Sequence, residues 1–121
     1  MEYATDVKNR RLQVVIDAIG DGGLLKIGTS GMQTILSVVK LETPAFTAPA
    51  NGEISLNGRF AFDPRARATG VARAAQITTA SGKIVVDGLT AGQSGAQVEL
   101  VNENIQEGQE VRIAAGSIVH A

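Results

Sequence analysis

The side chains that could carry out covalent chemistry in this 121-residue chain are few and scattered. There is no cysteine, and the one imidazole belongs to His120, next to the last residue. Nucleophilic catalysis needs a base beside the nucleophile, and residues 92–96 match the G-x-S-x-G motif only in part because its final glycine is missing. Asp63 and Asp87 could form a carboxylate pair, but few aromatic side chains are present to stack on a sugar. We therefore expect that the protein is not an enzyme.

The glycine-rich segments do not match the common phosphate or calcium sites. Lys83 follows a glycine but precedes Ile84, where a phosphate-binding loop requires serine or threonine. The glycines after Asp17 and Asp21 lack the alternating oxygen ligands of a calcium loop and suit the end of a helix better. We expect no cofactor and no metal ion.

The charged side chains are segregated along the chain, and this is the most informative chemical feature of the sequence. Residues 59–73 contain four arginines and one carboxylate, Asp63. Residues 84–111 contain no lysine or arginine but five carboxylates. The arginines are Arg59, Arg65, Arg67 and Arg73, and the carboxylates are Asp87, Glu99, Glu103, Glu107 and Glu110.

This segregation has two interpretations. The basic segment of one copy could bind an acidic region of a neighbour, because the planar guanidinium of arginine holds a carboxylate through two parallel hydrogen bonds. The segments could equally pair within the domain, across adjacent strands. Under the first interpretation we predict a partner-binding surface at Arg59, Arg65, Arg67 and Arg73, and a second one on the predicted helix at Lys8, Arg10 and Arg11.

A protein partner fits these charges better than nucleic acid or a membrane. The formal net charge is −1, which excludes a globally basic nucleic-acid binder. No aromatic side chains are interleaved with the arginines of residues 65–73 to stack on bases. No apolar run approaches the ~20 residues that a membrane-spanning helix needs. We expect no direct contact with nucleic acid and none with a membrane.

One helix is predicted near the start of the chain, over residues 5–19. Leu12, Val15, Ile16 and Ile19 repeat at i, i+3, i+4 and i+7, which places them on one side of a helix. Thr5 and Asp6 are candidates to cap its first turn, and the glycines around Asp21 end it.

After residue 23 the spacing of apolar residues changes to two, which is typical of strands. A strand over residues 33–41 is apolar on both faces and is expected to be central. Gly58 marks a bend within the alternating segment 54–62, and Ser81-Gly82 predicts a hairpin. Further strands are expected at residues 24–27, 71–79, 83–87, 98–100, 111–113 and 117–121.

These elements predict a mostly β fold with one short N-terminal α-helix. Short strands separated by turn residues are typical of a single antiparallel β-sandwich, here expected to be jelly-roll-like. Residues 1–23 would form the helix and a glycine-rich break, and residues 24–121 the β-sandwich, within one domain. A core built mostly of small side chains is shallow, so we expect homo-oligomer formation to add stability.

Several stretches of the chain resemble a family of small proteins encoded in the head-morphogenesis region of tailed bacteriophages. They are residues 3–9 (YATDVKN), 12–13 and 15–19 (LQ and VIDAI), 25–27 (LKI), 43–46 (TPAF), 50–52 (ANG) and 68–72 (ATGVA). The resemblance spans most of the chain. It consists of ordinary residues and marks no chemical motif.

The resemblance implies a virion structural protein. Small β-rich proteins of this group act as cement or decoration proteins, which bind the major capsid protein and hold neighbouring capsid subunits together through non-covalent contacts. We therefore expect a capsid cement protein on the virion surface, assembled in the bacterial host cytoplasm. Two alternatives stay open: a head–tail neck or tail-terminator protein, and a module that binds carbohydrate on a host surface.

Overall fold

Helix α1 (Thr5–Ile19) has the bounds that the sequence predicts. The structure is a computed structural model, and it describes residues 2–42, 45–56 and 62–119. Leu12, Ile16 and Ile19 are buried because their spacing places them on the side of the helix that faces the sheet. The helix therefore packs through a narrow aliphatic stripe.

The two ends of α1 differ in how well the sequence predicts them. At the C-terminal end, Gly20 adopts a φ of 66°, a conformation that glycine accepts without strain. At the N-terminal end, the expected side-chain cap is wrong. Thr5 is already helical, the N-cap residue is Ala4, and no side chain caps the helix. Asp6 instead forms an ion pair with Arg10 one turn later.

The rest of the chain is mostly β, as predicted, and short strands alternate with turns. In chain order the elements are β1 (Leu24–Gly28), the 3₁₀ turn η1 (Ser30–Met32), β2 (Ile35–Lys40), β3 (Glu53–Ser55), β4 (Phe62–Asp63), β5 (Gly70–Val71), β6 (Ala74–Thr78), β7 (Ile84–Gly92), β8 (Val98–Leu100), β9 (Asn104–Ile105) and β10 (Val111–Val119).

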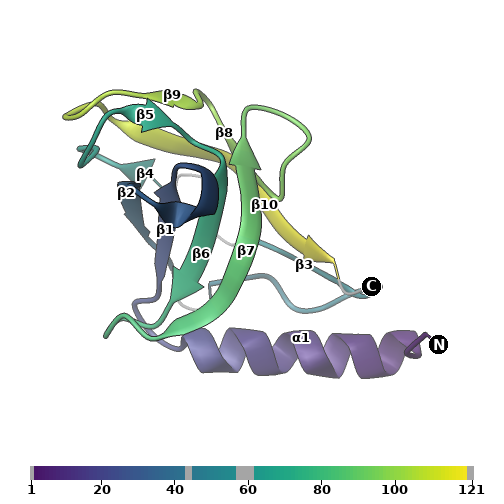
Figure 1. The fold of residues 1–121 in the computed structure, drawn as a ribbon. Coiled ribbons are helices and arrows are strands. Elements are labelled where there is room, and N and C mark those ends of the chain that lie inside the picture. The colour runs from purple at the N-terminus through teal and green to yellow at the C-terminus, as the bar shows by residue number, and fades with distance from the viewer. Residues whose placement is uncertain (1, 43–44, 57–61, 120–121) are drawn as a thin grey trace.

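Most strands belong to one curled sheet with the order β2-β1-β6-β7-β8-β10-β3, in which β4 also pairs with β10. The short strands β5 and β9 form a separate pair at one end of it (Figure 1). Every ladder is antiparallel except β7–β8, which is parallel at Ala91 and Gly92. The mostly β fold with an N-terminal helix is confirmed, and the jelly-roll-like sandwich arrangement stays a prediction.

Strand β2 lies at the end of the hydrogen-bonded order, whereas the sequence favoured a central position. Its outer edge is nevertheless covered, and successive residues Leu36 and Ser37 are both buried, so both faces of the strand are shielded from solvent. The backbone N–H of Val38 donates to the carboxylate of Asp63 (3.2 Å), and the N–H of Arg67 donates to the carbonyl of Leu36 (2.8 Å). Since Asp63 belongs to β4 and β4 pairs with β10, the sheet curls back toward its own first edge here.

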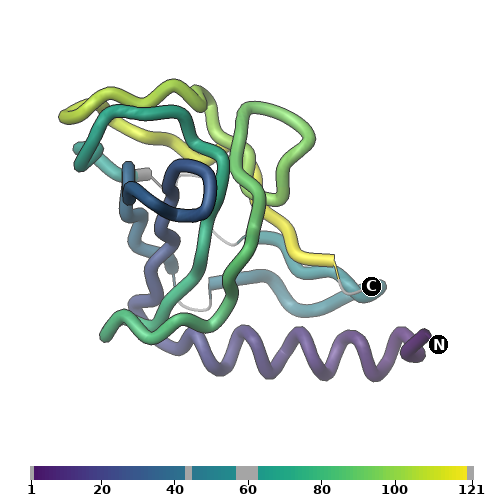
Figure 2. Tube along the Cα trace, in the orientation of Figure 1, coloured from purple at the N-terminus to yellow at the C-terminus, as the bar shows by residue number. Residues whose placement is uncertain are grey.

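Helix α1 covers the opposite end of the core. It lies across the ends of several strands, separated from the β5–β9 pair by the length of the sheet (Figure 2). It contacts both β7 and β3, which are not neighbours in the sheet. The side-chain oxygen of Asn9 also accepts a hydrogen bond from the N–H of Gly52, beside β3 (2.9 Å). The helix therefore bridges two strands that the hydrogen-bond ladders leave apart.

Two further strand predictions change in detail. The expected strand 71–79 is divided into β5 and β6. The backbone N–H of Ala72 donates to the backbone carbonyl of Glu103, whereas the backbone N–H of Arg73 donates to the backbone carbonyl of Gly28, so the chain changes its pairing partner between the two residues. The expected strand 111–113 and the described part of the expected strand 117–121 are joined in β10, and residues 120–121 lie outside the described residues. The bend expected at Gly58 lies outside the described residues. The Ser81-Gly82 hairpin between β6 and β7 is confirmed, with Gly82 at a φ of 97°.

Replacing Ile19 with alanine tests how much the inner side of α1 contributes to stability. Ile19 is 2 % exposed, so Ile19→Ala should lower the free energy of unfolding by about 3 kcal/mol through lost burial and a residual cavity. Val14 is 66 % exposed on the same helix, and Val14→Ala should change it by less than about 0.5 kcal/mol. Urea unfolding followed by circular dichroism in dilute solution measures both. Equal losses would contradict this packing of the helix.

Candidate interaction surface

The structure divides the predicted basic segment into parts with different roles. Arg65 and Arg67 lie in the loop of residues 64–69 between β4 and β5, here called the basic loop, and both are exposed. Arg73 lies beyond β5 and forms an ion pair with Glu103. Arg59 lies outside the described residues. The part of the predicted surface that the structure brings together is thus the pair Arg65 and Arg67.

The backbone of the basic loop is held on both sides. The N–H of Ala66 donates to the carbonyl of Gln109 (2.7 Å), and the N–H of Gly108 donates to the carbonyl of Ala66 (2.9 Å). On the other side, the N–H of Arg67 donates to Leu36 of β2. Ala66 is 3 % exposed, so it anchors the loop between the two arginines. A loop fixed in this way loses little conformational freedom when it binds a partner.

The carboxylate of Asp63 organises the entry to this loop. It is 8 % exposed and accepts hydrogen bonds from the hydroxyl of Ser37 (2.8 Å), the N–H of Val38 (3.2 Å) and the N–H of Arg65 (3.1 Å). A buried charge is tolerated when hydrogen bonds replace its lost hydration. The same side chain therefore links β2 to β4 and sets the direction of the chain at the start of the basic loop.

The side chains of Arg65 and Arg67 are available for intermolecular contact. Within the part of the chain that the structure describes, neither guanidinium forms an ion pair or donates a hydrogen bond. Each carries five N–H donors in a planar arrangement that matches a carboxylate. The loop thus presents two positive charges on a fixed backbone.

The neighbouring acidic segment pairs partly within the domain. Glu103 accepts a hydrogen bond from Arg73, and Glu110 accepts one from Arg112. The hydrogen bond from Arg73 lowers the pKa of the Glu103 carboxyl below its ordinary value. For these residues the second interpretation of the charge pattern, pairing within the domain, holds. For Arg65 and Arg67 the first interpretation stays a prediction.

The helix cations Lys8, Arg10 and Arg11 do not form one surface. Lys8 lies on the partly buried side and pairs with Glu2 (3.2 Å). Arg10 pairs with Asp6 (2.9 Å) on an exposed side, and the guanidinium of Arg11 lies 4.5 Å from the centre of the Tyr3 ring. Because successive residues of a helix are rotated by about 100°, these three side chains project in different directions. They are a weaker candidate for a shared partner than the basic loop.

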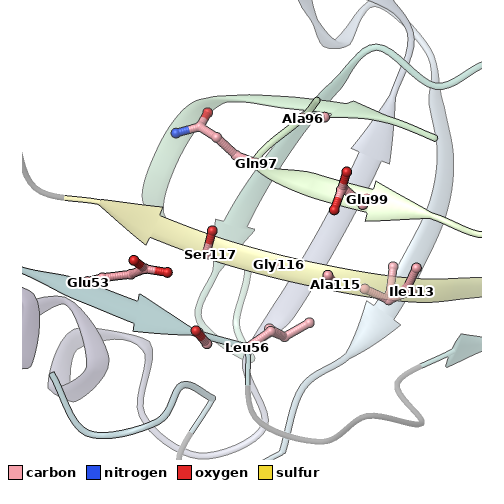
Figure 3. Close-up of a pocket in the computed structure, with 11 residues that line it drawn as sticks. Glu53, Leu56, Ala96, Gln97, Glu99, Ile113, Ala115, Gly116 and Ser117 are labelled. Carbon is pink, nitrogen blue, oxygen red and sulfur yellow. The ribbon is translucent and has the colours of Figure 1, made fainter. Parts of the chain in front are cut away.

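A shallow groove of about 410 Å³ lies over the exposed face of β8, β10 and β3 (Figure 3). Its floor is made of the small residues Ala115, Gly116 and Ser117, and Glu53 and Glu99 project from the flanking strands. Glu99 accepts a hydrogen bond from the N–H of Gly95 (3.1 Å). The sequence alone does not predict this groove, because three separate segments form it. The run of small residues 114–117 is the only signal of it in the sequence.

The chemistry of the described residues gives no catalytic constellation to build on. Asp63 and Asp87 do not act as a pair: Asp63 binds donors of β2 and the basic loop, whereas Asp87 accepts from Gln76 (3.4 Å) on β6. No group of three or more His, Cys, Asp or Glu side chains suited to a metal ion occurs among the residues described. His120 lies outside them.

Comparison with known proteins identifies no relative: no family model, no curated protein and no solved structure matches this chain. Within the described residues, no helix is long and apolar enough to cross a membrane.

Removing the Asp63 carboxylate should destabilise the protein strongly. Asp63→Ala leaves the Ser37 hydroxyl and the Val38 N–H without their acceptor in a buried place, which should cost about 3 kcal/mol of unfolding free energy. Asp87→Ala removes an exposed carboxylate and should cost less than about 0.5 kcal/mol. Urea unfolding at neutral pH compares the two variants. Similar values would show that Asp63 does not hold the edge of the sheet.

The Arg73–Glu103 pair should make a pH-dependent contribution to stability. The pKa of Glu103 is lowered in the folded protein from an ordinary value of 4.5, so its stabilising effect is complete above that value. The effect is lost as the pH falls through the lower pKa of the folded state. Wild type should therefore exceed Glu103→Gln in stability at pH 7, and the difference should shrink as the pH is lowered below 4.5. Urea unfolding across this range measures it, and a difference that persists in acid would rule out the pair as its source.

Proposed function

We propose that this protein is a capsid cement protein, which binds the major capsid protein shell of a tailed bacteriophage and stabilises it through non-covalent contacts. The resemblance to phage head-region proteins supports this proposal. So does the kind of surface present, which offers charged groups for contact and no assembled catalytic site in the described residues. The proposed location is the outer surface of the virion.

The observation that carries the proposal is the basic loop, whose backbone is held by hydrogen bonds to β2 and to residues 108–109. The guanidinium groups of Arg65 and Arg67 form no ion pair or hydrogen bond with any residue that the structure describes. Charged contacts of this kind are individually weak in water. On a shell the same contact repeats at many equivalent positions, and neighbouring attachments raise the effective concentration of each.

The rival functions fit the described surface less well. A carbohydrate-binding module needs exposed aromatic side chains along a groove. Of the aromatic side chains that the structure describes, Phe46 is 3 % exposed, and Tyr3 is 36 % exposed but does not line the groove over β8, β10 and β3. A head–tail neck protein differs from a cement protein in number, since it forms one ring per particle.

Copy number per particle tests the proposal directly. Virions purified from the bacteria that produce this protein should contain it in hundreds of copies, measured by gel densitometry against the major capsid protein. Six or twelve copies would assign the protein to the neck, and its absence from virions would reject both structural roles.

Charge reversal tests the contact surface. Arg65→Glu combined with Arg67→Glu should reduce binding to shells that lack the protein by at least about tenfold, because each attraction becomes a repulsion. The matched control reverses two exposed lysines, Lys40 at the end of β2 and Lys83 in the turn before β7, and should bind like wild type. Occupancy is measured by co-sedimentation with the shells. Full occupancy by the arginine double variant would remove the basic loop from the interface.

A further inference from the structure

Helix α1 carries a second apolar stripe on the side that faces away from the sheet. It consists of Tyr3, just before the helix, and Val7, Val14 and Ala18, and is here called the outer stripe. Tyr3 is 36 % exposed, Val7 38 % and Val14 66 %. At about 100° per residue these positions fall together on nearly the opposite side from Leu12, Ile16 and Ile19. The helix is therefore apolar on two sides.

This arrangement is unusual for a helix at a protein surface, where the outward side is normally polar. A shallow hollow of about 340 Å³ also lies beside the stripe, lined by Arg11, Leu12, Val14 and Val15. All four residues belong to α1, so the hollow lies on the helix surface, where it offers a place for an incoming apolar side chain. The outer stripe is therefore apolar and lies beside a hollow, two properties of a surface that packs against another helix or strand.

The charges along one flank of the outer stripe indicate which element binds there. Arg10 and Asp17 lie on the same flank of the outer stripe. Along the helix axis, the point midway between them falls between residues 13 and 14. When two identical helices pack antiparallel around a two-fold axis, each flank faces the same flank of the other helix. An axis near Val14 then places Arg10 of each copy beside Asp17 of the second copy, so this contact occurs twice in the dimer. Within its own helix Arg10 pairs with Asp6 and Asp17 accepts a hydrogen bond from Gln13, and both contacts are exposed, so the contact between copies adds to them.

Other orientations and partners fit these charges less well. A parallel pair would bring Arg10 of one copy beside Arg11 of the second copy, a repulsive contact. Helices that lie on anionic membranes carry mainly lysine and arginine along their polar side. Here the acidic residues Glu2, Asp6 and Asp17 balance the cations.

We propose that two copies of this protein form an antiparallel dimer through the outer stripes of their α1 helices. The 15-residue helix is about 22 Å long, so the contact is small compared with a stable interface. The dimer is therefore weak and depends on protein concentration. This inference concerns self-association and is independent of the proposed function, so either can fail without the other.

Analytical ultracentrifugation over a range of concentrations tests the dimer. Wild type should show a reversible monomer–dimer equilibrium, and Val14→Lys should remain monomeric because it places a charge at the centre of the stripe. Val101→Lys is the matched control, since Val101 is a valine of similar exposure (61 %) outside the helix, and it should dimerise like wild type. A wild type that stays monomeric at every concentration, or a Val14→Lys variant that still dimerises, would overturn the proposal.

A charge swap tests the antiparallel orientation. Arg10→Asp alone and Asp17→Arg alone each create two like-charge contacts and should weaken the dimer by about tenfold. The combined variant restores opposite charges across the axis and should dimerise with nearly the wild-type dissociation constant. Circular dichroism verifies that all three variants keep the helix. A combined variant that is as weak as the single ones would overturn the antiparallel arrangement.

Discussion

The hydrogen bonds to the buried carboxylate of Asp63 are the interaction on which the closure of this sheet depends. Strand β2 ends the hydrogen-bonded order, so its outer N–H groups need acceptors from elsewhere. The Asp63 side chain supplies one at Val38 and also accepts from the Ser37 hydroxyl. Because Asp63 belongs to β4, and β4 pairs with β10, this one carboxylate links the first edge of the sheet to its C-terminal strand.

The same carboxylate couples the fold to the candidate surface. Its second oxygen accepts the N–H of Arg65, which fixes the chain just after Pro64, a residue that has no N–H of its own. The basic loop therefore inherits its conformation from the sheet edge. In the neighbouring acidic segment, Glu103 pairs with Arg73 inside the domain, whereas the guanidinium groups of Arg65 and Arg67 have no ion pair among the described residues. The fold thus uses some of its charges to hold the domain, and the proposed function assigns Arg65 and Arg67 to a partner.

Local patterns explain which parts of the fold the sequence predicted. The bounds of α1 follow from the spacing of Leu12, Ile16 and Ile19 and from the glycine at position 20. All of these residues are close together in the sequence. The hairpin at Ser81-Gly82 follows from two adjacent turn residues. Local information is sufficient in both places because the partners of each hydrogen bond are close in sequence.

The errors have the opposite origin, since they involve partners distant in the chain. The apolar pattern of β2 was assigned to a central strand because nothing in it signals that Asp63, 25 residues after Val38, would cover its edge. The division between β5 and β6 depends on acceptors at Glu103 and Gly28. At the candidate surface, the arginine cluster was visible in the sequence. Which arginines would be paired was not, because Arg73 finds Glu103 across 30 residues.

A cryo-electron microscopy map of intact virions is the sharpest test of the capsid cement proposal, because it shows where this fold is attached and through which loop. We expect copies of the curled sheet on the outer face of the shell, with residues 64–69 against carboxylates of the capsid protein. A map in which the fold forms a ring at the head–tail joint, or lies on the shell with the basic loop directed into solvent, would contradict it.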